Sequence, residues 1–148
     1  MKPGQIFALI SGIFFLILGI MGFFPNLLQG PVVGSEVSDA YSIGYGMIFG
    51  VIPTNSIHNT IRVVAGLSGI LASISLDSTR IYCRILAASY GLFAILGLIP
   101  YTDTFFGTVP IFGSDVLLHG ISAAIATYFG FFASPGLLEI SEKPQVNS

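Results

Sequence analysis

Residues 5–24 read QIFALISGIFFLILGIMGFF, an apolar run that contains no charged side chain. A helix rises about 1.5 Å per residue, so about 20 residues cross the roughly 30 Å hydrocarbon core of a bilayer. The run is longer than the apolar part of a typical signal peptide, and no small-residue cleavage pattern follows it. It therefore predicts a retained membrane-spanning helix, which ends before Pro25 because proline stops a helix.

Three further apolar stretches extend this pattern along the chain: residues 57–75, 81–99 and 115–132, of which the last is the shortest. Only a short turn separates 57–75 from 81–99, which predicts two antiparallel neighbouring helices. Together the four stretches predict an all-α membrane protein, a four-helix transmembrane bundle formed by a single domain over residues 1–133.

Two segments do not fit a membrane-spanning helix. Residues 43–52, IGYGMIFGVI, are apolar but too short to cross, which predicts a re-entrant or interfacial segment between the first and second helices. Residues 134–148 contain Pro, Glu, Lys and Asn, and predict a mobile C-terminal tail.

The composition excludes several classes of protein. Charged residues make up 8% of the chain, five Lys or Arg and seven Asp or Glu. An ordinary soluble domain has about 25%, so the composition excludes that class. The net charge of −2, with scattered basic residues, excludes nucleic-acid binding. The single cysteine, Cys83, excludes an internal disulfide and a cysteine-rich metal site.

The basic residues that flank the predicted helices indicate the orientation. They are Lys2, Arg80, Arg84 and Lys143, and all four fall on one side of the predicted bundle. The two longer loops on the other side contain acidic residues and no Lys or Arg. The positive-inside rule therefore places both termini in the cytoplasm.

Five polar residues lie near the start of the second and fourth predicted spans, where ionisable groups are costly and point to a role. His58, Asn59 and Arg62 belong to the second helix, and Asp115 and His119 to the fourth. Each set continues a stripe of small residues at helical spacing, so we expect both stripes to face the bundle interior. The two stripes are His58, Arg62, Ala65 and Gly69 in the second helix, and Asp115, His119, Ser122, Ala126 and Gly130 in the fourth.

The depth of these side chains predicts a specific pair. With Ser56 and Ser114 as candidate N-caps, Arg62 lies six residues past the first cap and His119 five past the second. Both therefore sit about 8–9 Å into their helices. Asp115 lies one turn above His119, so a buried Arg62–Asp115 ion pair is expected.

The same cluster leaves several functions open. It can act as a structural lock that fixes helix register. His58 and His119 can instead ligate a tetrapyrrole, either haem or chlorophyll, or form a metal site with Asp115. A proton or ion path in a small dimeric transporter is a further alternative. No nucleophile, base and orienting group occur together, so no enzymatic activity is expected.

The run Ile52-Pro-Thr-Asn-Ser-Ile-His58-Asn59-x-x-Arg62, with Asp115-x-Leu-Leu-His119 downstream, resembles a bacterial family of four-span membrane proteins known as a domain of unknown function. The resemblance covers roughly residues 5–132 and implies a four-helix membrane bundle without an assigned activity. The family pattern has His-Asn-x-x-His where this chain has Arg62 in the last position. Arginine does not ligate a metal or haem iron in ordinary circumstances, so this difference favours an ion pair over a bis-histidine haem.

These observations predict a small integral membrane protein of a bacterial inner membrane or a thylakoid membrane. It is expected to lack catalytic activity and to be an accessory or structural subunit that packs against a larger membrane complex. Its expected partners are the lipid bilayer and either another membrane protein or further copies of itself.

Overall fold

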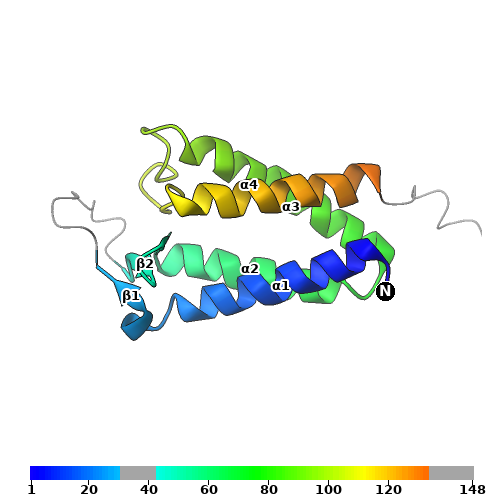
Figure 1. Cartoon of the computed structure of the whole chain (residues 1–148), viewed down its shortest axis with the longest axis horizontal. Helices are drawn as coiled ribbons and strands as arrows, with labels where there is room; N and C mark the ends of the chain where they lie inside the picture. The colour runs from blue at the N-terminus through cyan, green and yellow to red at the C-terminus, as the bar shows by residue number, and fades with distance from the viewer. Residues whose placement is uncertain (31–42, 134–148) are drawn as a thin grey trace, which may run out of the picture.

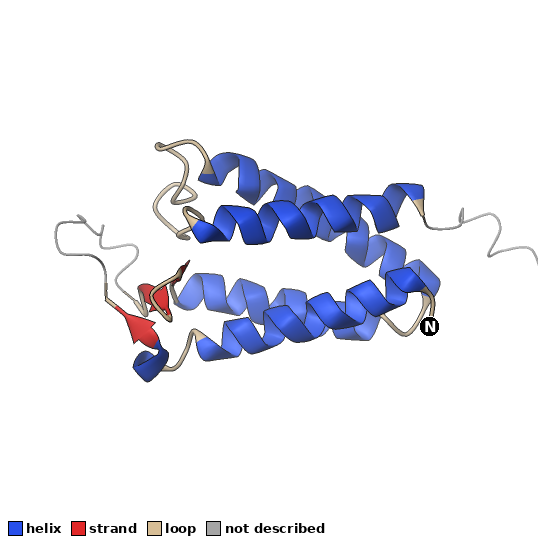
Figure 2. Cartoon of the chain, in the orientation of Figure 1, coloured by secondary structure: helices blue, strands red, loops and turns tan. Residues whose placement is uncertain are grey.

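The computed structural model describes residues 1–30 and 43–133 (Figure 1). The predicted tail at 134–148, and the part of the first loop that holds Glu36 and Asp39, lie outside the described residues. The described chain is mostly helical, with a small sheet at one end (Figure 2). The helices are α1 (Pro3–Met21), α2 (Ser56–Ala72), α3 (Leu76–Gly97) and α4 (Ser114–Thr127), which continues as one π-helical turn (Tyr128–Phe132).

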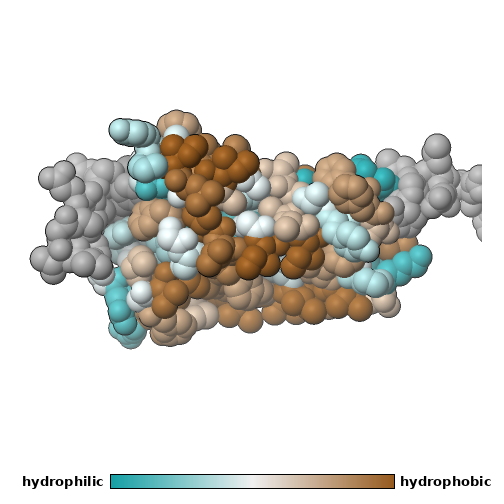
Figure 3. Space-filling model, turned by 45° about the horizontal axis from the view of Figure 1, so that its top comes forward, coloured by the Kyte–Doolittle hydropathy of each residue, from teal (hydrophilic) through white to brown (hydrophobic). Residues whose placement is uncertain are grey.

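Three of the helices are long and apolar enough to cross a membrane: Pro3–Met21, Leu76–Gly97 and Ser114–Phe132. They correspond to three of the predicted spans. The fourth, α2, has 17 residues, which extend about 25 Å. In the face that Figure 3 shows, hydrophobic residues cover the middle and hydrophilic residues gather toward the two ends, as expected for a protein surrounded by lipid.

Helices α1 and α2 form the first of two helical pairs, and glycines bring their backbones together. A Cβ atom added at Gly12 would lie 2.6 Å from the Ile70 nitrogen and 2.7 Å from the Gly66 oxygen. At Gly19 it would lie 2.8 Å from the Asn59 oxygen. No side chain fits at these contacts, so the glycines permit the close approach that membrane helices use in place of a hydrophobic driving force.

Helices α3 and α4 form the second pair, on the other side of the bundle (Figure 1). Near the N-terminal end of the bundle, Arg84 of α3 donates a hydrogen bond from Nε to the Gly130 carbonyl, 2.9 Å away in the π-helical turn. Between the two pairs, the ring of Phe15 packs edge-on against Tyr90, with centroids 5.0 Å apart. The core is therefore made of aromatic and small side chains together with Leu86, and all four helices contribute to it.

The sheet corrects the all-α prediction. Strands β1 (Leu28–Gln29), β2 (Gly46–Ile48) and β3 (Ile52–Thr54) pair antiparallel in the order β1-β2-β3. The stretch predicted to be re-entrant or interfacial, residues 43–52, contains β2 and its turn into β3. The turn places Phe49 and Gly50 at positive φ (51° and 72°), a conformation that suits Gly50 and strains Phe49.

The helix N-caps also differ from the prediction. Asn55, not Ser56, caps α2, because its Oδ1 accepts a hydrogen bond of 2.8 Å from the His58 backbone nitrogen. Gly113 occupies the cap position of α4 with a φ of 66°. Ser114 instead donates from Oγ to the Val51 carbonyl, 2.5 Å away, which ties the start of α4 to the sheet.

Candidate functional site

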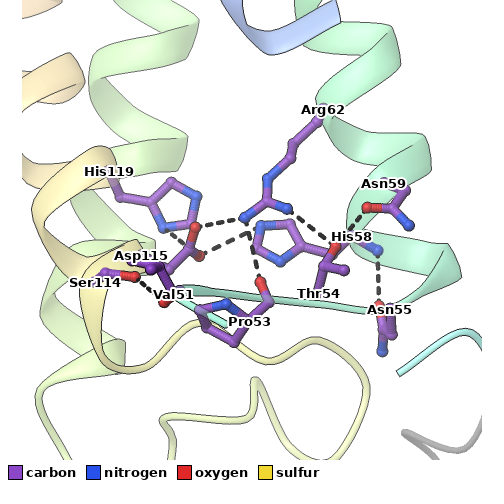
Figure 4. A network of polar contacts seen from close by, with 10 residues as sticks. All are labelled: Val51, Pro53, Thr54, Asn55, His58, Asn59, Arg62, Ser114, Asp115 and His119. Atoms are coloured by element: carbon purple, nitrogen blue, oxygen red, sulfur yellow. Dashed lines mark hydrogen bonds and ion pairs between the residues drawn. The ribbon is translucent and has the colours of Figure 1, made fainter. Parts of the chain in front are cut away.

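The guanidinium of Arg62 lies at the centre of a buried polar network between α2, α4 and the sheet (Figure 4). Its Nη2 donates to Asp115 Oδ1 at 2.6 Å and to the Pro53 carbonyl at 3.3 Å. Its Nη1 donates to Thr54 Oγ1 at 3.0 Å. The expected ion pair between Arg62 and Asp115 is therefore present, and β3 supplies further acceptors to the same guanidinium.

The second oxygen of Asp115 faces both histidines. Asp115 Oδ2 lies 3.4 Å from His58 Nε2 and 3.3 Å from His119 Nδ1. His119 is four residues after Asp115 on α4, so the helix itself brings this pair together. His58 reaches the same carboxylate from α2.

Asn59 joins the network through Thr54. Its Oδ1 accepts a short hydrogen bond from Thr54 Oγ1, which in turn accepts from Arg62. Asn59 therefore supports the arginine through one intermediate side chain. We use the name polar cluster for the set Thr54, His58, Asn59, Arg62, Asp115 and His119.

All six members of the polar cluster are 0% or 1% exposed. Removing a charge from water is expensive, and it is tolerated where the charge is paired and hydrogen-bonded. The contacts of Arg62 meet this requirement, because a carboxylate, a hydroxyl and a carbonyl surround its two terminal nitrogens. The cluster thus holds a neutralised pair with two imidazoles beside it.

Two aromatic residues of α3, which were not predicted from the sequence, enclose His119. The Tyr90 ring meets the imidazole edge-on at a centroid distance of 4.6 Å, and the Phe93 ring lies at 5.3 Å. Their spacing of three residues on one helix face is the signal that could have identified them. These rings shield the imidazole from the lipid-facing side of α3.

The burial of both histidines limits which of the predicted ligands fits the site. A tetrapyrrole held by His58 and His119 requires a flat slot beside the imidazoles, yet the Asp115 carboxylate lies between them and both rings are at most 1% exposed. The arrangement suits a small cation better than a macrocycle. The polar cluster also lies at the sheet end of the bundle (Figures 1 and 4). This position does not favour a proton or ion path, which would run between the two ends.

A separate apolar groove of about 670 Å³ lies between α2 and α3. Small residues occur on both of its walls, and Tyr90 and Phe93 line it on the side toward His119. The small residues that line it are Ala65, Ser68 and Ala72 of α2 and Ser78 and Ser89 of α3.

Residues 5–132 match a family described as Domain of unknown function (DUF4383). The chain belongs to this family. No curated protein and no solved structure matches it. The DUF4383 match covers α2, α3, α4, the sheet and all but the first two residues of α1. It includes every member of the polar cluster, so both the cluster and the groove lie inside the family domain.

Proposed function

We propose that this DUF4383 protein is a four-span, non-enzymatic membrane subunit that packs against a transmembrane helix of another membrane protein. The observation that carries the proposal is the apolar groove between α2 and α3. A groove with small residues on both walls allows a helix backbone to approach closely, as in other membrane helix contacts.

The packing of α2 supports a fourth span. Although α2 is short, it runs antiparallel to α1 over most of its length, with Gly12 against Gly66 and Gly19 against Asn59. A helix that follows a membrane-spanning neighbour at this distance occupies the same depth. Its length of about 25 Å is within reach of a hydrocarbon core through modest local thinning of the bilayer.

The positions of the N-terminus and of the helix ends support the proposed orientation. The N-terminus, the turn between α2 and α3 and the end of α4 lie at one end of the bundle, and the sheet lies at the other (Figure 1). Lys2, Arg80 and Arg84 belong to the first end, whereas Asp103 lies in the loop at the sheet end. The positive-inside rule then favours a cytoplasmic N-terminus, in a bacterial inner membrane or a thylakoid membrane.

Site-specific photocrosslinking in the native membrane tests the partner. A photoreactive amino acid at Ile85 lies in the groove, and Ile85 is 63% exposed. The matched control is Ile121 on α4, which is 60% exposed and does not line the groove. We expect illumination to join the chain to one partner protein when the photoreactive residue is at position 85, which gives a single product of defined mass. We expect no such product from position 121. Filling the groove with Ser68→Phe is expected to remove that adduct.

Two other outcomes overturn the proposal. An adduct with twice the 15.7 kDa mass of the chain identifies a second copy as the occupant of the groove. Lipid adducts alone, equal at Ile85 and Ile121, mean that the groove faces only the bilayer.

A further inference from the structure

Three buried side-chain atoms converge within the polar cluster: His58 Nε2, His119 Nδ1 and Asp115 Oδ2. All three lie within 4.8 Å of one another. None of them has a hydrogen-bond partner of good geometry among the described residues. Buried polar atoms are nearly always satisfied, so three unsatisfied atoms at one point require an explanation.

We infer that His58, Asp115 and His119 form a binding site for a divalent transition-metal cation. The inference is independent of the groove and its partner, because none of the three residues lines the groove.

The distances fit a cation of this kind. Two ligand atoms that bind one cation at about 2.0–2.1 Å with a tetrahedral angle lie about 3.3–3.4 Å apart. The distances from Asp115 Oδ2 to His58 Nε2 and His119 Nδ1 are 3.4 and 3.3 Å. The two nitrogens need to approach each other on binding, which a rotation of either imidazole about χ2 allows.

The ligand types select among metals. Two imidazole nitrogens and one carboxylate oxygen suit zinc and the neighbouring transition metals. Calcium and magnesium prefer sites made of oxygen ligands. Three protein ligands also leave a fourth coordination position for water or a small anion.

The charge of Arg62 sets a condition on this site. Its guanidinium binds Asp115 Oδ1, which leaves Oδ2 as the oxygen that faces the histidines. The positive charge of Arg62 also repels the metal cation at this site, because charges interact strongly in a buried environment. An anion in the fourth position reduces this repulsion, so we expect chloride or hydroxide to accompany the metal.

The experiment uses the full chain, purified in mild detergent, stripped with a chelator and dialysed against Zn²⁺ or Mg²⁺ alone. We expect one Zn²⁺ per chain by elemental analysis, and no retained Mg²⁺. His58→Gln and His119→Gln should each weaken Zn²⁺ binding by more than about 100-fold, since loss of a ligand exceeds the effect of losing an outer-shell partner. Tyr90→Phe is the matched control, because it alters a neighbour of His119 without removing a ligand, and it should keep one Zn²⁺ per chain.

A second measurement protects the test from variants that do not fold. Co²⁺ added to the stripped wild-type chain should develop the visible absorption of a cation bound by nitrogen and oxygen ligands in a tetrahedral site, and Zn²⁺ should displace it. Zn²⁺ should also raise the unfolding temperature of the wild-type chain. The inference is overturned if wild type keeps less than one Zn²⁺ per chain and shows no Co²⁺ spectrum. It is equally overturned if folded histidine variants bind Zn²⁺ as wild type does.

Discussion

Arg62 of α2 and Asp115 of α4 form an ion pair of 2.6 Å with both side chains 1% exposed. The pair joins the two helical pairs of the bundle, at the end where the sheet lies (Figures 1 and 4). Because the two residues belong to helices that are not neighbours along the chain, the pair fixes how α1 and α2 sit against α3 and α4.

Replacing Asp115 by Ala is expected to destabilise the fold by about 3–5 kcal/mol, because it leaves the Arg62 guanidinium buried without a counter-charge. The free energy of unfolding in detergent, measured by denaturant titration, checks this value. The double variant Arg62→Met with Asp115→Leu is expected to regain much of the loss, since an apolar pair leaves no buried charge. An Asp115→Ala variant as stable as wild type would show that the ion pair does not hold the two helical pairs together.

Gly12→Ala is expected to destabilise the first helical pair by about 1–3 kcal/mol, as other overpacking substitutions do. The added methyl group would lie 2.6 Å from the Ile70 backbone nitrogen. Gly120→Ala is the control, because its nearest neighbour, the Ala94 Cβ atom, is 3.9 Å away. Thermal unfolding of the two variants should separate clearly, with Gly120→Ala close to wild type or above it. Equal losses in both variants would show that helix contact does not decide the effect.

Asn55 has two separable roles, which two substitutions distinguish. Its Oδ1 caps α2 at the His58 nitrogen, and its Nδ2 donates to the Thr108 carbonyl at 2.9 Å. Asn55→Asp keeps the cap and loses the donor, whereas Asn55→Ala loses both. We expect the free energy of unfolding to fall by about 1 kcal/mol more for Ala than for Asp. The reverse order would mean that the buried carboxylate, which faces the Thr108 carbonyl, costs more than the cap contributes.

Cysteine labelling with a membrane-impermeant maleimide tests the four-span topology. Ile74 is 78% exposed in the turn between α2 and α3, and Tyr101 is 92% exposed in the loop before α4. Ile74→Cys should react from the cytoplasmic face and Tyr101→Cys from the opposite face. The native Cys83 is 0% exposed and gives little background. Labelling of both positions from one side would exclude a membrane-spanning α3.

The visible absorption spectrum of the protein, extracted in mild detergent from its own membrane, is expected to lack tetrapyrrole bands. Both imidazoles are at most 1% exposed and face Asp115, and Tyr90 and Phe93 enclose His119, which leaves no slot for a macrocycle beside the imidazoles. Co-purifying bands that disappear in His58→Ala and in His119→Ala would instead place a tetrapyrrole at the cluster.

The sequence predicts the helices and the central ion pair well, because both follow from periodic physical requirements. Apolar length marks α1, α3 and α4 as candidate spans. Helical spacing places Arg62 and Asp115 on inward faces, and the equal depth of Arg62 and His119 puts Asp115, one turn above His119, within reach of Arg62.

The remaining contacts of the site depend on chain segments without such periodicity. The strand that supplies Thr54 and the Pro53 carbonyl to Arg62 has three residues, too few to show the alternation that identifies a strand. The cap of α2 lies one residue earlier than predicted because Asn55, rather than Ser56, has the side chain that reaches the His58 nitrogen. Such details depend on tertiary contacts that one sequence does not display.

The separation of Arg62 from Asp115 along the chain also has a consequence for biosynthesis. Synthesis reaches Asp115 53 residues after Arg62, which takes about 3–10 s at roughly 5–20 residues per second. During that interval Arg62 can bind only partners made early, such as Thr54 and the Pro53 carbonyl. Until then the Arg62 guanidinium has hydrogen-bond acceptors but no carboxylate partner, so the ion pair that joins the two helical pairs forms only after the start of α4 has been made.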